Sequence, residues 1–117
     1  MKYDLDYVAD ILLAATDIGE FLTGVSMEKF STDKLIRSAV MRQLEIMSEA
    51  TKRLSTEFRA EHTSVPWKRI AGLRDRLIHA YDDLDLEYAW EAATVALPKV
   101  RAYLEILLPN YKKEQDN

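Results

Sequence analysis

The apolar residues of this chain recur three and four positions apart, the spacing that gathers them on one face of an α-helix. One such stripe comprises Leu5, Val8, Leu12, Ala15, Ile18 and Leu22, and a second comprises Ile36, Val40, Leu44, Met47 and Leu54. Glycine and proline, which interrupt helices, are scarce. The pattern therefore predicts an all-α fold, an up-and-down bundle of four long helices.

Helix starts are indicated by side chains that accept hydrogen bonds from the free amide groups of a first turn. The expected starts are Asp4, Ser31 or Thr32, Ser64–Val65–Pro66–Trp67, and Asp85. The second helix should follow a loop over residues 24–31 and end near Ser55, with residues 56–62 as a weaker turn. The third should run toward His79. Pro98 either kinks the last helix or opens a fifth, because proline removes a helical hydrogen bond and crowds the preceding turn.

Size and composition indicate one globular domain. The chain has 117 residues, 48% hydrophobic and 31% charged, and we assign residues 1–111 to a single helical domain and 112–117 to a frayed tail. It has no cysteine and two histidines, which excludes disulfides, thiolate nucleophiles and cysteine-based metal sites. We therefore expect neither a metal nor another cofactor.

Charge is distributed unevenly along the chain. The formal net charge is -4, but residues 29–81 carry +5 and the two ends together carry -9. An acidic protein is a poor indiscriminate binder of nucleic acid, although a confined basic cleft is compatible with this distribution. Residues 1–10 carry acids where a secretory signal has a basic start, and no apolar run approaches the roughly 20 residues of a membrane span. We expect a cytoplasmic protein without a membrane partner.

Reactive side chains are densest between Lys68 and Tyr81. Four cations lie in this segment, Lys68, Arg69, Arg74 and Arg76, together with Asp75, His79 and Tyr81. Histidine exchanges protons near neutral pH, and an arginine can hold a phosphate and the charge that develops on it during displacement. These groups could cleave RNA, whose own 2'-hydroxyl supplies the nucleophile.

Helix geometry complicates this hypothesis. His79 lies five positions after Arg74, which places them about 140° apart around an ideal helix. They converge only if the helix ends near His79 or if two copies of the chain form a composite cleft, and the second alternative predicts a homodimer. The structural alternative is that Asp75 and His79 form an ordinary helical pair and that Lys68 and Arg76 are solvated charges.

The segment from Pro66 to Tyr81 resembles the signature of the HEPN superfamily, and within it the HepT-like toxins of prokaryotic toxin-antitoxin pairs. The family motif is arginine, a polar residue, three further residues, histidine, any residue and tyrosine; Arg74, Asp75, His79 and Tyr81 match it without a gap. The similarity covers most of the chain. Two departures are Ser48 before Glu49, where the family often has glycine, and Asp75, where asparagine is commoner; neither contradicts the assignment, although both could alter activity.

The resemblance implies a metal-independent endoribonuclease toxin of a type VII-like pair, a homodimer with the motif at its interface. His79 would act as general acid or base, Arg74 would hold the scissile phosphate, and Asp75 would orient one of them. Lys68, Arg69 and Arg76 are weaker candidates for RNA contacts. The implied antitoxin is an MntA-like nucleotidyltransferase that adenylylates the motif tyrosine. Because the reaction needs a 2'-hydroxyl, we expect RNA and not DNA as substrate.

The alternative function is a non-catalytic HEPN module that binds a nucleotidyltransferase, which the acidic net charge favours and the Arg74/His79 pair disfavours. Glu45 and Glu49 have a spacing that could hold a metal, but neighbouring cations favour salt bridges. His62 is expected to be exposed. Trp67 and Trp90, which could stack on bases, are expected in core or dimer contacts instead.

Overall fold

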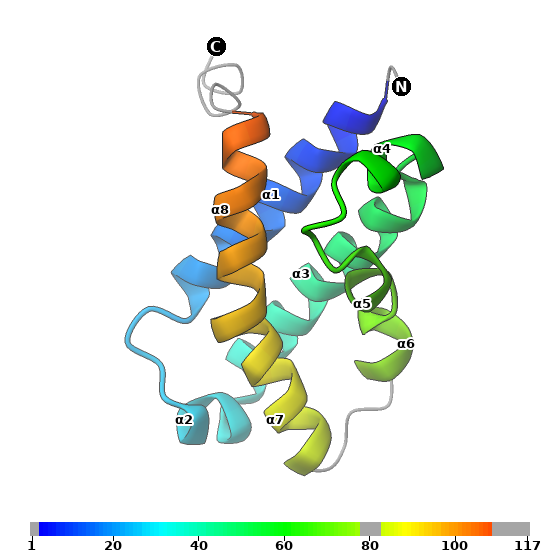
Figure 1. The fold of residues 1–117 in the computed structure, drawn as a ribbon. Coiled ribbons are helices and arrows are strands. Elements are labelled where there is room, and N and C mark those ends of the chain that lie inside the picture. Colours follow the sequence, from blue (N-terminus) through cyan, green and yellow to red (C-terminus); the bar gives the residue numbers. More distant parts are fainter. Residues whose placement is uncertain (1–2, 78–82, 109–117) are drawn as a thin grey trace.

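The computed structural model describes residues 3–77 and 83–108, and within these ranges the secondary structure is entirely helical (Figure 1). The elements are α1 (Asp4–Phe21), α2 (Met27–Thr32), α3 (Lys34–Arg53), α4 (Thr56–Glu61), α5 (Trp67–Ala71), α6 (Leu73–Leu77), α7 (Asp83–Glu91), the π-helical turn η1 (Ala92–Ala96) and α8 (Leu97–Leu107). The predicted all-α fold is confirmed. No helix in the described ranges is long and apolar enough to cross a membrane.

Two long helices and one long rod form the bundle. Helix α1 packs along α3, α8 packs against α1, and α7, η1 and α8 follow one another as the rod drawn from yellow to orange in Figure 1. Their buried residues are mainly apolar and include Val8, Ile11 and Ile18 on α1, Val40, Leu44 and Met47 on α3, and Leu97, Val100 and Leu104 on α8. Burying each such large side chain contributes about 1.5–3 kcal/mol. Helices α5 and α6 contact α3 beside this core.

The start of α1 differs from the prediction. Leu5 is 50% exposed, whereas Asp4 is buried. Asp4 is also not the cap of α1, since Tyr3 occupies that position. Its carboxylate instead accepts hydrogen bonds from the Ser55 amide at 2.8 Å and the Ser55 hydroxyl at 2.7 Å, which turns Asp4 inward and Leu5 outward.

The predicted loop over residues 24–31 contains the short helix α2. Ser26 caps it by accepting from the Lys29 amide, and α2 buries Phe30 completely, 5.5 Å from the ring of Trp90. Asp33 caps α3, so the predicted caps at Ser31 and Thr32 are wrong: their hydroxyls donate to the carbonyls of Met27 and Glu28 instead.

The third predicted helix is interrupted. Residues 56–61 form α4, capped by Ser55, and Pro66 occupies the N-cap position of α5 without a side-chain cap from Ser64. Gly72 separates α5 from α6, and the predicted end at His79 lies outside the described residues. Asp85 lies inside α7, which begins at Asp83, so it is not the cap of that helix.

Pro98 lies in the first turn of α8, yet no loop separates α8 from α7. The helix widens just before the proline, where the Leu97 amide donates to the carbonyl of Ala92, five residues back. The Thr94 hydroxyl donates to the Trp90 carbonyl at 2.7 Å within the same turn. The wider turn accommodates a proline that an ordinary α-helix interior would exclude.

Candidate active site around Arg74

Two of the four motif residues lie in the described part of the chain. Arg74 and Asp75 are on α6, where Arg74 is half-buried and Asp75 is exposed. His79 and Tyr81 lie outside the described residues, so the predicted convergence of Arg74 with His79 stays a prediction.

The break before Arg74 is fixed by a side chain of α3. At the end of α5 the Gly72 amide donates to the carbonyl of Lys68 at 3.1 Å. The carbonyl of Ala71, the last residue of α5, accepts a hydrogen bond of 2.6 Å from the hydroxyl of Ser48, which is fully buried. Ser48 therefore holds the break in place three residues before Arg74.

Arg74 opens onto a polar hollow of about 510 Å³ between α1, α3 and α6. The charged side chains that line it are Asp10, Arg42, Glu45, Glu49, Arg53 and Arg74. Three cations and three anions give a formal charge of zero. Within residues 3–77 and 83–108, the ion pair in this hollow joins Arg42 and Glu45 at 3.4 Å, and no carboxylate lies within ion-pair distance of Arg74.

The predicted salt bridging of Glu45 is confirmed by this pair with Arg42. Both side chains are substantially exposed, so the pair contributes little to stability. For Glu49 no ion pair occurs among the described residues, although it lines the same hollow. In that part of the chain no three histidine, cysteine or carboxylate side chains come close enough together to hold a metal ion.

The remaining cations of the motif segment have different surroundings. Lys68 is exposed. Arg69 forms an ion pair with Glu91 and donates to the Tyr88 hydroxyl at 3.3 Å, while Arg76 lies over the Tyr88 ring at 3.8 Å from its centroid. Tyr88 and Glu91 were not predicted from the sequence as partners of these arginines, although their i, i+3 spacing places them on one face of a helix.

A family model described as Ribonuclease HepT-like matches residues 11–107, a span that includes α3, the part of the hollow's lining on α3 and α6, and the whole motif. The chain belongs to the HepT-like ribonuclease family. The predicted family is thus confirmed.

Relatives with similar sequences carry ribonuclease names. "Putative RNase TTE0752" of Caldanaerobacter subterraneus is 38% identical over 96% of this HepT-like chain and 100% of its own length. "Putative RNase MJ1380" of Methanocaldococcus jannaschii is 38% identical, covering 86% and 93% of the two chains. "Probable ribonuclease HepT" of Thermococcus cleftensis is 37% identical, covering 87% and 93%. No solved structure matches the chain.

The two tryptophans of this HepT-like chain serve packing, as expected. Trp67 is 7% exposed and its indole N–H donates to the His62 carbonyl at 2.8 Å, while Trp90 packs on Phe30. The expectation that His62 is exposed is wrong. His62 is half-buried, its Nδ1 lies 3.0 Å from the Tyr103 hydroxyl of α8, and its ring packs against that of Phe58 at a tilt.

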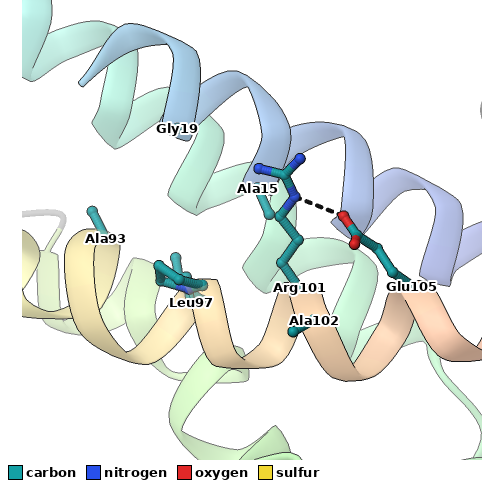
Figure 2. A pocket seen from close by; sticks show the side chains of 8 residues that line it. Ala15, Gly19, Ala93, Leu97, Arg101, Ala102 and Glu105 are labelled. Atoms are coloured by element: carbon teal, nitrogen blue, oxygen red, sulfur yellow. Dashed lines mark hydrogen bonds and ion pairs between the residues drawn. The ribbon is translucent and has the colours of Figure 1, made fainter. Parts of the chain in front are cut away.

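A second hollow, of about 250 Å³, lies between α1 and the rod (Figure 2). Small residues line it, among them Ala15, Gly19 and Ala93, and Arg101 reaches across it toward α1 while donating to Glu105 at 2.8 Å. None of the predicted site residues lines this hollow. We take the hollow at Arg74 as the candidate active site of the HepT-like chain, because a residue of the motif lines it.

Proposed function

We propose that this HepT-like protein is a metal-independent endoribonuclease toxin that acts in the cytoplasm. Arg74 holds the scissile phosphate, His79 transfers protons, and Asp75 orients one of these two side chains. Lys68, exposed one turn before the break at Gly72, contributes a contact to the RNA backbone. The family membership supports ribonuclease activity, and the residue roles follow from the motif.

The observation that carries the proposal is the environment of Arg74. A half-buried guanidinium without a carboxylate partner in the described ranges is ready to bind an anion, and the adjoining hollow gives an anion room to enter. An arginine presents several N–H donors in a planar fork that matches phosphate oxygens. The carboxylates lining the hollow offset its other arginines, which disfavours indiscriminate retention of polyanions.

The reaction needs no group beyond these side chains and the RNA. The 2'-oxygen forms a bond to phosphorus as it loses its proton to His79, and the bond from phosphorus to the 5'-oxygen breaks as that oxygen receives a proton from a protonated His79 imidazole. The products are a 2',3'-cyclic phosphate and a 5'-hydroxyl. Arg74 stabilises the additional negative charge that develops on the phosphoryl oxygens in the transition state.

Assembly and control form the second part of the proposal. The protein acts as a homodimer in which each cleft draws on both copies, which reconciles the 140° divergence of Arg74 and His79 on an ideal helix. Its partner is an MntA-like nucleotidyltransferase antitoxin that transfers an adenylyl group from ATP to the Tyr81 hydroxyl and releases pyrophosphate. The added phosphodiester blocks the RNA path by bulk and by like charge.

Cleavage of RNA by the purified protein in EDTA tests the nuclease. Arg74→Ala and His79→Ala should each lower the rate by on the order of a hundredfold or more. Arg101→Ala is the matched control, because Arg101 lines the other hollow and should leave the rate within about twofold. Wild-type rates in both site variants would refute the proposal, and RNA binding without cleavage would favour the non-catalytic module.

Mass spectrometry after incubation with ATP, magnesium and the nucleotidyltransferase tests the control step. The wild-type chain should gain adenylyl groups and lose activity, whereas Tyr81→Phe should stay active and unmodified. Silencing of an unmodified wild-type chain would instead indicate simple occlusion.

A further inference from the structure

Helix α6 carries Arg74 and does not continue α5, because Gly72 separates the two helices. Its orientation is therefore set by its own tertiary contacts rather than by α5. In the described part of α6, Leu73–Leu77, these contacts include the burial of Leu73 and Leu77.

Arg76 provides a further contact, on another side of α6. Its guanidinium carbon lies 3.8 Å from the centroid of the Tyr88 ring on α7, close enough for a cation–π interaction. Arg76 lies two positions after Arg74, which places them about 200° apart around the helix. Arg76 can therefore contact α7 while Arg74 faces the hollow on α1 and α3.

The same tyrosine also contacts α5. Arg69 donates to the Tyr88 hydroxyl at 3.3 Å, its guanidinium carbon lies 5.2 Å from the ring centroid, and it forms an ion pair with Glu91. Burial alone would lower the pKa of the Arg69 guanidinium, but hydrogen bonds to Glu91 and Tyr88 outweigh it and raise that pKa. Tyr88 thus contacts arginines on both sides of the break at Gly72.

We infer that Tyr88 is a positioning residue for Arg74, which it keeps directed into the hollow by holding α6 through Arg76 and α5 through Arg69. The inference rests on the proposed role of Arg74 in phosphate binding. It also assigns Arg76 a task other than the RNA contact expected from the sequence. A rotation of α6 that separated Arg76 from the ring would turn Arg74 away from α1 and α3.

Steady-state kinetics with a double-mutant cycle distinguish a role of Arg76 in positioning Arg74 from a direct contact of Arg76 with RNA. Arg76→Ala and Tyr88→Leu should each lower kcat about tenfold with KM and its salt dependence unchanged, and the double variant should fall no further. Tyr88→Phe keeps the ring and should retain most of kcat, and Arg76→Lys should restore part of it. The matched control is Tyr103→Leu, a half-buried, hydrogen-bonded tyrosine on α8, which should leave kcat unchanged below its unfolding transition.

Two kinetic outcomes would overturn the inference. If Arg76→Ala raises KM and reduces the salt slope by about one, while Tyr88→Leu cleaves normally, Arg76 binds RNA directly. If Tyr88→Leu lowers Tm but leaves kcat unchanged in folded protein, the tyrosine only stabilises the fold.

Hydrogen exchange tests the contact without relying on activity. Amides of α6 should exchange severalfold faster in Arg76→Ala and Tyr88→Leu than in the wild type or in Tyr103→Leu, and equal exchange would overturn the inference. A wild-type chain that cuts no RNA, or an Arg74→Ala chain that cuts RNA normally, would instead refute the proposed function. In that case the hydrogen-exchange rates of α6 would still decide whether Tyr88 holds this helix.

Discussion

Replacing Ser48 by alanine removes one buried hydroxyl from the C-terminal half of α3. The side chain is fully buried, and its Oγ lies 2.6 Å from the Ala71 carbonyl oxygen at the break between α5 and α6. The variant loses that hydrogen bond, worth about 1 kcal/mol net, and leaves the carbonyl without its donor at a cost of about 1–3 kcal/mol in all. Because Ala71 is half-buried, water can compensate in part, so we expect a loss of about 1–2 kcal/mol.

Urea unfolding followed by tryptophan fluorescence measures this loss, since Trp67 and Trp90 both report on the packed bundle. The midpoint should fall while the slope stays constant. Ser38→Ala on the same helix is the control; Ser38 is exposed and its replacement should change stability by less than about 0.5 kcal/mol. If the two variants are equally stable, the hydrogen bond does not hold the break.

Ser48→Gly extends the same reasoning. The variant loses the same hydrogen bond and adds roughly 1 kcal/mol for glycine inside a helix. It should therefore be less stable than Ser48→Ala, even though glycine is common at this position in the family that the sequence resembles. A glycine variant as stable as the wild type would show that the neighbouring backbone repacks to satisfy the Ala71 carbonyl.

Two further predictions concern other parts of the fold. Burial alone would raise the pKa of Asp4, but hydrogen bonds from Ser55 outweigh it and hold that pKa below its usual value. The stabilisation of the fold by the Asp4 carboxylate is therefore complete above the unfolded-state pKa, and it is lost as pH falls through the lower folded-state pKa. Asp4→Asn should therefore flatten the dependence of Tm on pH below about 4, and Asp6→Asn, at an exposed position, should not. Phe30→Ala should lower the free energy of unfolding by about 3–5 kcal/mol, because it empties a fully buried site beside Trp90; a loss under about 1 kcal/mol in chemical denaturation would show that α2 is not part of the cooperative core.

The long helices were predictable because their apolar positions follow one period over many turns. In α3, Val40, Leu44 and Met47 are buried as the pattern requires. The ends of helices were less predictable, since several residues can cap and tertiary contacts choose among them. Asp33 takes the role expected of Ser31 or Thr32, and the pairing of Asp4 with Ser55 joins residues 51 positions apart.

The candidate site likewise has a part that was predictable from the sequence and a part that was not. Arg74 and Asp75 were found from the motif, which is local in sequence. The hollow was not predictable, because its lining comes from α1, α3 and α6, and no local pattern specifies how these helices approach one another. The partners of Arg69 and Arg76 were not predicted, because they lie on α7 and no local pattern indicates that contact. From the sequence alone, an arginine beside a motif is interpreted as a substrate contact.

The π-helical turn links the length of the rod to its sequence. The turn at Ala92–Ala96 contains one residue more than an α-helical turn, and this extra residue is absorbed just before Pro98. Deleting one residue there would return the turn to the ordinary period and bring the proline ring against the carbonyl four residues earlier, which costs about 3 kcal/mol or more. The rod can therefore be shortened at this point only together with replacement of Pro98, so insertion, deletion and substitution at the junction of α7 and α8 are not independent events.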